Sequence, residues 1–198
     1  MREPLRRIFD VVVSAVVLIV LSPLIALAAI AIKLTSRGPV LYRQQRVGHH
    51  GHPFDVLKLR SMVAGAEHTG AGLAVNKGDS RITTVGRVLR RTSLDELPNL
   101  VNVIKGEMSI IGPRPTVQVQ VDQYTERQRR RLELKPGITG WAQVNGRASL
   151  PWPERIELDI DYIDRRSTRM DLKILGKTVK QMFTGQDHYR GDTGGWTS

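Results

Sequence analysis

An uninterrupted apolar run near the start of the chain constrains the fold most. Between residues 8 and 32 the only residues that are not apolar are Asp10, Ser14, Ser22 and Pro23. As a helix this run would be about 37 Å long at ~1.5 Å per residue, which exceeds a hydrocarbon core of about 30 Å. A core helix of a soluble protein seldom lacks a polar stripe over such a length. The run therefore predicts a membrane helix.

The flanks and the middle of this run indicate how the helix meets the membrane. Cytoplasmic flanks carry the excess of Lys and Arg, and here both flanks are basic. Pro23 removes a helix hydrogen bond and bends the helix, while the hydroxyl of Ser22 can satisfy the freed carbonyl. These features favour a kinked, re-entrant helix that leaves by the leaflet it entered, and a simple span stays open. The flanking basic residues are Arg2, Arg6, Arg7, Lys33, Arg37, Arg43 and Arg46.

Composition narrows the classes of function. The chain has 198 residues, no cysteine and a formal net charge of +11. The lack of cysteine excludes disulfide scaffolds, Cys-based zinc sites and thiol nucleophiles. The positive charge suggests a polyanionic partner, such as nucleic acid, a phosphorylated small molecule or an anionic membrane surface. A nucleic-acid binder needs a basic stripe with interleaved aromatics, and aromatics are only 5% of the chain, so we expect no nucleic-acid partner.

The remainder of the chain is predicted to form one compact α/β domain that is mainly helical. We divide the chain into a membrane helix over 1–36, a domain that carries the chemistry over 37–185 and a C-terminal tail over 186–198. The last predicted helix has an apolar face beside a lysine-rich one, which is typical of a helix lying at the membrane interface, although packing on the core is the alternative. The predicted strands cover 39–42 and 54–59, and the predicted helices cover 85–91, 98–105, 119–134, 153–164 and 171–183.

Two adjacent carboxylates, Asp95 and Glu96, are the first candidates for chemistry. Pro98 follows them, and proline fits only the first turn of a helix, so a helix is expected to begin close to Asp95. One interpretation is capping, because Ser93 and Glu96 have capping-box spacing and acidic residues complement a helix N-terminus. The other is a functional site, because a helix N-terminus also binds phosphate.

Basic residues surround this pair in the sequence. Lys58 and Arg60 lie at the end of a predicted strand, Arg90 lies just before the pair, and Arg114 is held between two prolines. Arginine is suited to two-pronged contacts with phosphate. Cations beside an acidic pair are typical of phosphoryl transfer, in which a carboxylate acts as nucleophile and Mg²⁺ bridges carboxylate and phosphate. The lack of a Walker lysine loop argues against a P-loop NTPase.

Two other segments are less specific. His49, His50 and His52 lie in a turn rich in Gly and Pro without other obvious ligands, so an ordinary loop is expected there rather than a metal site. The segment 137–147 is rich in glycine and in amide and guanidinium donors. It is either a tight turn with a strand or a loop that contacts a nucleotide or sugar, and its spacing leaves both open.

Taken in order, these motifs resemble the bacterial sugar transferase family, the monotopic phosphoglycosyl transferases, and in particular its small members that consist of the catalytic domain alone. The resemblance covers residues 5–182, and several long motifs in the same order make it specific. They are Ser22-Pro23, 58–62, 81–83, 85–87, 93–98, 106–109, 113–115, 137–147, 157–159 and 171–175.

The resemblance implies a re-entrant membrane helix and an active site at the cytoplasmic face of the bacterial inner membrane. The family moves a phosphosugar from a UDP-sugar to undecaprenyl phosphate and releases UMP. By motif, Asp95 would be the nucleophile that forms a covalent phosphosugar intermediate and would contact Mg²⁺, while Glu96 would assist as acid/base or by positioning. The residues implied to bind phosphate or nucleotide are Lys58, Arg60, Arg90, Arg114 and Arg147.

Departures from the family pattern concern the sugar rather than the reaction. Ala148 stands where many relatives have a polar residue, and the tail over 187–192 is distinctive. Two alternatives remain at this point, namely the same transfer through a ternary complex and a non-catalytic membrane scaffold. A homo-oligomer is compatible with the sequence.

Overall fold

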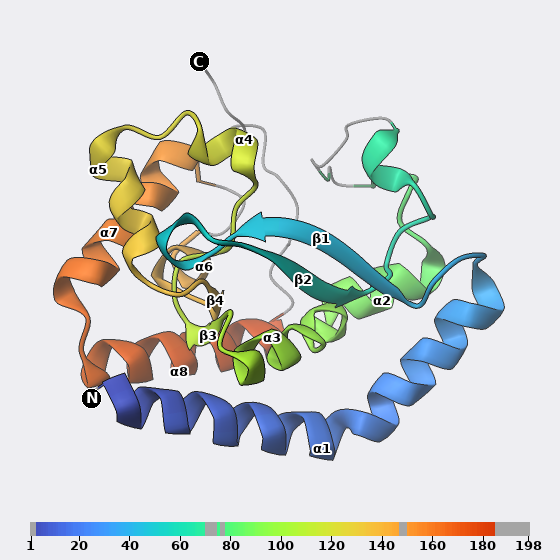
Figure 1. The fold of residues 1–198 in the computed structure, drawn as a ribbon. Helices are drawn as coiled ribbons and strands as arrows, with labels where there is room; N and C mark the ends of the chain where they lie inside the picture. Colours follow the sequence, from blue (N-terminus) through green and yellow to red (C-terminus); the bar gives the residue numbers. More distant parts are fainter. Residues whose placement is uncertain (1–2, 70–74, 76–77, 147–149, 185–198) are drawn as a thin grey trace.

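The computed structural model describes residues 3–69, 75, 78–146 and 150–184, and the chain folds as a mainly helical α/β protein (Figure 1). Single turns of 3₁₀ helix lie at His49–Gly51, Ala66–His68, Leu94–Glu96 and Arg130–Glu133. The strands are β1 (Leu41–Val47), β2 (Pro53–Leu59), β3 (Ser109–Ile111) and β4 (Gly137–Thr139). The helices are α1 (Glu3–Thr35), α2 (Thr84–Arg91), α3 (Asn99–Lys105), α4 (Gln118–Val121), α5 (Glu126–Arg129), α6 (Trp141–Val144), α7 (Trp152–Arg165) and α8 (Thr168–Thr184).

Two small sheets organise the domain. Strands β1 and β2 form an antiparallel hairpin in which Tyr42 lies opposite Lys58. Strands β3 and β4 pair in parallel, and the crossover between them carries α4 and α5. Glycine is required at this second sheet, because a Cβ at Gly137 would lie 2.1 Å from the backbone nitrogen of Gly112. The two backbones therefore approach as closely as only glycine permits.

The main hydrophobic core lies between the hairpin, α3, β3, α7 and α8. Val103, Tyr162 and Ile174 are almost completely buried within it. A second cluster joins α1 to β2 and α2, where Ile32 packs with Leu59. Helix α1 is thus packed against the rest of the structure at this end.

The N-terminal half of α1 is fixed to the domain by polar contacts. The carboxylate of Asp10 is buried and accepts hydrogen bonds from Ser109 Oγ at 2.7 Å and from the backbone N–H of Ile110 at 3.2 Å. Arg7 donates to the carbonyl of Ile104 at 2.6 Å, near the C-terminal end of α3. The Arg7 bond satisfies a carbonyl that the end of α3 leaves without a helical partner.

The C-terminal end of α1 is held by Arg60. Its buried guanidinium donates to the carbonyls of Ser36 and Arg37, each at 2.8 Å, and to Ser36 Oγ at 2.7 Å. These acceptors lie just beyond the last turn of α1, where a cation also complements the helix dipole. Both ends of α1 therefore contact the same domain.

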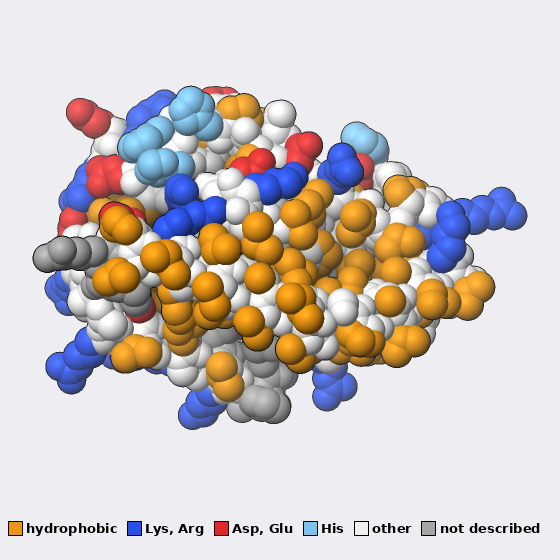
Figure 2. Space-filling view, turned by 60° about the horizontal axis from the view of Figure 1, so that its bottom comes forward, with side chains coloured by type: hydrophobic (Ala, Val, Ile, Leu, Met, Phe, Trp, Pro, Cys, Tyr) orange, Lys and Arg blue, Asp and Glu red, His pale blue; other side chains and the backbone are white. Residues whose placement is uncertain are grey.

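The middle of α1 bends and exposes an apolar surface. Pro23 lies inside the helix, which changes direction part-way along its length (Figure 1). Ser22 Oγ donates at 2.8 Å to the carbonyl of Ile19, the group that proline leaves without a donor, so the predicted role of this serine is confirmed. Figure 2 shows hydrophobic side chains gathered over the side of the molecule on which α1 lies. Those of α1 that are exposed include Val12, Val16, Ile19, Val20, Leu27 and Ile30.

Among the described residues, α1 is the one helix that is long and apolar enough to cross a membrane. Its length and composition agree with the predicted membrane helix over 1–36. Only about a tenth of its most apolar window is buried inside the protein. A soluble core helix would be mostly buried, so the exposed face of α1 needs an apolar environment outside the domain.

Two predicted elements were wrong in their bounds. The first strand covers Leu41–Val47 rather than 39–42, so the hairpin is longer than its apolar residues suggest. The predicted helix over 119–134 is three short pieces. The chain breaks because Thr125 has an extended backbone and forms a capping box with Gln128, which starts a new helix. The predicted tail over 186–198 lies outside the described residues.

Helix α8 packs one side on the core and exposes the other. Ile174 is fully buried in the core, which matches the packing alternative, while Leu172 and Val179 are exposed on the outer side. Two of its lysines contact Trp141, because the ammonium groups of Lys173 and Lys177 lie 5.1 and 5.0 Å from the centre of its ring. Contact of the outer side with lipid stays a prediction.

Candidate active site

The acidic pair lies in the connection between α2 and α3. One turn of 3₁₀ helix, Leu94–Glu96, follows Ser93, whose backbone is left-handed with φ of 58°. Ser93 makes no side-chain cap, and α3 begins only at Asn99. The capping-box interpretation is therefore wrong. The carboxylates of Asp95 and Glu96 are left to other partners.

Glu96 is held between two cations that come from distant parts of the chain. Its Oε1 accepts from Lys58 Nζ of β2 at 2.7 Å and from Arg114 Nη2 of the Pro-Arg-Pro segment at 2.9 Å. Burial alone would raise the pKa of Glu96, but the charges and hydrogen bonds of Arg114 and Lys58 hold that pKa well below its ordinary value. Glu96 is consequently a stable anion at neutral pH.

Asp95 has the opposite environment. Its side chain is buried, yet it forms no hydrogen bond or ion pair with any residue that the structure describes. Burial and, after it, the adjacent charge of Glu96 raise the pKa of Asp95 to about 6, although Lys58, Arg90 and Arg114 oppose the rise. Neighbouring carboxylates whose pKa values are pushed apart are typical of groups with different catalytic roles. Asp95 is the one with oxygens available for a ligand.

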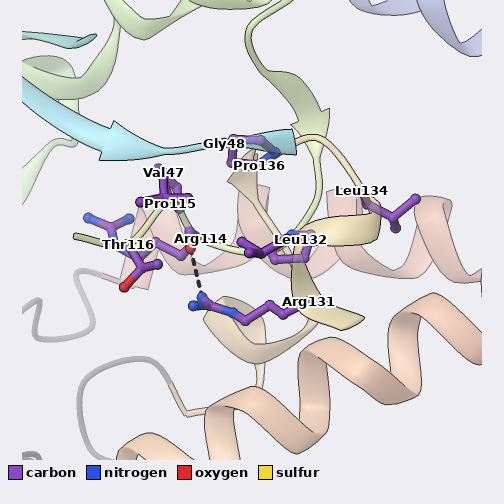
Figure 3. A pocket seen from close by; sticks show the side chains of 10 residues that line it. Val47, Gly48, Arg114, Pro115, Thr116, Arg131, Leu132, Leu134 and Pro136 are labelled. Atoms are coloured by element: carbon purple, nitrogen blue, oxygen red, sulfur yellow. Dashed lines mark hydrogen bonds between the residues drawn. The ribbon is translucent and has the colours of Figure 1, made fainter. Parts of the chain in front are cut away.

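A buried network holds Arg114 from behind. Arg131 donates through Nη2 to the carbonyl of Arg114 at 2.7 Å, a contact drawn in Figure 3. The same guanidinium donates through Nε to Asp159 Oδ2 at 2.6 Å and through Nη1 to the hydroxyl of Tyr124 at 2.7 Å. Arg131 and Asp159 are both nearly inaccessible to solvent. This network fixes the backbone from which Arg114 reaches Glu96.

The structure brings together some of the predicted site residues but not all of them. Lys58 and Arg114 meet at Glu96, and Arg90 is close enough to Asp95 for its charge to lower the pKa of that carboxyl. Arg60 instead binds the end of α1, as described above. Its contact with a substrate stays a prediction. Arg147 lies outside the described residues.

The sequence interpretation missed Arg131 and Asp159. A signal was present, because Asp159 is three residues after Ile156 and beside Ile160, on the face of α7 that turns out to be buried. A carboxylate at a core-facing helical position requires a buried cation as partner. The sequence does not indicate which of the many arginines this is.

The histidine turn and the segment 137–147 form ordinary turns, strands and helices where the structure describes them. The histidines lie in the turn that joins β1 and β2, where His49 Nε2 donates to the carbonyl of Glu133 at 3.0 Å. The segment from Gly137 forms β4 and then α6. Within the described ranges, no three His, Asp or Glu side chains form a group that could hold a metal ion by themselves. A metal at the acidic pair would depend on Asp95 together with ligands from a substrate.

Comparison with known proteins identifies the family of the chain. The chain matches the family of bacterial sugar transferases over residues 1–185. The chain belongs to the bacterial sugar transferase family. It is 44% identical over 192 residues to the UDP-glucose:undecaprenyl-phosphate glucose-1-phosphate transferase of Caulobacter vibrioides, and the match covers 93% of this chain and 72% of that protein.

Other members of the family differ in length and in sugar. The chain is 41% identical over 182 residues to the uncharacterized sugar transferase EpsL of Bacillus subtilis, covering 92% of this chain and 89% of that protein. It is also 41% identical over 200 residues to the undecaprenyl-phosphate galactose phosphotransferase of Salmonella typhimurium, covering 93% of this chain and 42% of that longer protein. This member of the family is therefore a transferase.

Breaking the network behind Arg114 should destabilise the fold. In Asp159→Ala the charge of Arg131 stays buried without its partner, which costs about 3–5 kcal/mol of unfolding free energy. Asp161→Ala is the matched control, because Asp161 lies on the same helix but pairs with Arg165 near the surface, and such pairs contribute under about 1 kcal/mol. Denaturant unfolding followed by circular dichroism measures both. Equal losses in the two variants would contradict the account.

Proposed function

We propose that this transferase moves a sugar 1-phosphate from a UDP-sugar to undecaprenyl phosphate, with release of UMP, through a covalent intermediate on Asp95. The support for the substrates is the named activity of relatives that are more than 40% identical over nearly the whole chain. The observation that carries the mechanism is the contrast within the acidic pair. Asp95 has no partner among the described residues, whereas Glu96 is held by Lys58 and Arg114.

The transfer would proceed by two displacements at one phosphorus atom. In the first, an oxygen of the ionised Asp95 attacks the phosphorus that carries the sugar, a new P–O bond forms, and the bond from that phosphorus to the bridging oxygen breaks. The electron pair leaves on UMP. In the second, a phosphate oxygen of undecaprenyl phosphate attacks the same phosphorus and releases the Asp95 carboxylate. A covalent intermediate lets a soluble and a lipid substrate use the site in turn.

Glu96 acts in this proposal by positioning. A carboxyl whose pKa lies well below its ordinary value is not a proton donor at neutral pH. Its anion instead keeps Lys58 and Arg114 together beside Asp95. Both cations then face the place where the diphosphate must lie, and they stabilise the charge that develops on the leaving UMP.

The residues fit Mg²⁺ as the metal. Protein-bound Mg²⁺ is commonly held by one or two carboxylates together with substrate phosphates and water, so a single free carboxylate is a sufficient protein contribution. Asp95 would hold it. The ion would supply charge neutralisation at the diphosphate.

The proposed location is the cytoplasmic face of the bacterial inner membrane, with α1 as a re-entrant helix. Support comes from the contacts at its two ends, since Arg7 and Asp10 bind α3 and β3 while Ser36 and Arg37 bind Arg60. A helix that crossed the bilayer would leave one of these ends on the far side. The outer side chains Leu172 and Val179 of α8 would add a contact with the interface.

Asp95→Asn should abolish UMP release. The amide is isosteric but is not a nucleophile, so we expect a loss of at least about a thousandfold. The assay uses purified protein in nanodiscs with undecaprenyl phosphate, Mg²⁺ and a panel of UDP-sugars. Asp122→Asn is the control, because Asp122 is exposed and bonds only to Gln118 in the described structure. Substantial turnover by Asp95→Asn would remove Asp95 as nucleophile.

The rate of UMP release should fall in mildly acidic solution. Because the pKa of Asp95 is raised to about 6, its carboxyl is protonated below that pH and cannot attack. We expect kcat/KM for the donor to rise with pH below 6, approaching tenfold per pH unit, and to level off above about pH 7. Circular dichroism at each pH shows whether the fold persists. A flat profile down to pH 5 with folded protein would contradict the assignment.

The topology of α1 can be tested by labelling, because the chain has no cysteine of its own. Glu3→Cys and Arg37→Cys place single thiols at the two ends of the helix, and Arg129→Cys marks the domain. A membrane-impermeant maleimide should label all three in inverted vesicles and none in spheroplasts. Labelling of Glu3→Cys and Arg37→Cys from opposite sides would establish a span instead.

A further inference from the structure

Arg46 lies on the same face of the β-hairpin as Lys58. Residues directly opposite one another in an antiparallel pair share a face, and alternate residues along a strand return to it. The pairs Tyr42–Lys58 and Arg46–Phe54 therefore lie on one face. This face is the more buried one along β1, whereas Arg43 points to the opposite, exposed side.

The hairpin brings Arg46 beside the Pro-Arg-Pro segment. The backbone N–H of Val47 donates to the carbonyl of Thr116 at 2.8 Å, so the end of β1 runs along the chain that has just left Arg114. Arg46 is also close enough to Arg114 and Glu96 for their charges to affect its pKa. Burial and, to a smaller extent, the positive charge of Arg114 lower the pKa of Arg46 to about 10, while the charge of Glu96 opposes the decrease.

Arg46 lacks the partner that a half-buried arginine requires. Its side chain bonds to the amide oxygen of Gln44, and no carboxylate of the described residues lies within ion-pair distance. The nearest acidic group of the cluster, Glu96, already accepts from Lys58 and Arg114. A partly buried guanidinium beside another cation is unfavourable unless an anion joins them. Arginine is the residue best shaped to hold phosphate by two parallel N–H bonds.

We infer that Arg46 is a phosphate-binding residue of the Asp95 site, a role that rests on the proposed function. The phosphate belongs either to the diphosphate of the donor or to the lipid acceptor, since both must reach Asp95. Arg46 and Arg114 then hold one anion between them. The anion removes the repulsion between the two guanidinium groups.

Arg46→Gln compared with Arg43→Gln tests this inference, because the two arginines lie on opposite faces of the same strand. The readouts are the affinity for UDP by titration calorimetry and the KM values for the UDP-sugar and for undecaprenyl phosphate. We expect Arg46→Gln to weaken UDP binding and raise the donor KM by roughly ten- to a hundredfold, the effect of losing hydrogen bonds to a charged group. Arg43→Gln should stay within about twofold.

The outcomes separate the two phosphate sources and the two proposals. A rise confined to the acceptor KM would assign the phosphate to the lipid. Equal constants for Arg46→Gln and Arg43→Gln, with active wild type, would overturn the role of Arg46 and leave the proposed function standing. A wild type that neither binds UDP nor releases UMP would overturn both. If Arg46→Gln fails to fold, Arg46→Lys keeps the charge without the two-pronged contact, and unchanged constants there would equally overturn the inference.

Discussion

The interaction on which the site depends is the double ion pair at Glu96. One carboxylate oxygen joins Lys58 of the hairpin to Arg114 of the Pro-Arg-Pro segment, and the turn that carries Glu96 also carries Asp95. Because Glu96 takes the cations, Asp95 remains without a protein partner in the described structure and keeps a raised pKa. The arrangement divides two adjacent acidic residues into one that organises positive charge and one that is available to react. Behind it, the buried pair of Arg131 and Asp159 keeps the backbone of Arg114 in place.

The segment that carries Lys58 also connects this site to α1. Lys58 lies near the end of β2 and binds Glu96, and two residues later Arg60 binds the carbonyls that follow α1. The end of α1 and the acidic pair are therefore fixed to one piece of chain. This linkage suits a reaction in which one substrate has its phosphate at the headgroup plane. It also gives Arg60 a structural role at the end of α1.

The sequence predicted the apolar helix and the serine that satisfies the carbonyl at its bend, because both depend on the local residue pattern. It also predicted that Lys58 and Arg114 lie with the acidic pair, because these motifs occur together in the family that the chain resembles. It did not predict the task of Arg60, since a basic residue beside a motif gives no direction for its side chain. The predicted first strand ended at residue 42, so the prediction did not place Arg46 in the hairpin. The sequence alone does not distinguish a buried arginine such as Arg131 from the many exposed ones. In each case tertiary contacts, rather than local preference, decide the role.

The central claim is that Asp95 carries the phosphosugar during the reaction. The most direct test is the intact mass of the purified protein after incubation with Mg²⁺ and UDP-glucose or UDP-galactose in the absence of undecaprenyl phosphate, followed by peptide mapping. The account predicts an increase by one hexose phosphate on the peptide that contains Asp95, lost on adding undecaprenyl phosphate and absent from Asp95→Asn. A protein that releases UMP only when the lipid acceptor is present, with no adduct at any time, would contradict it and establish transfer through a ternary complex.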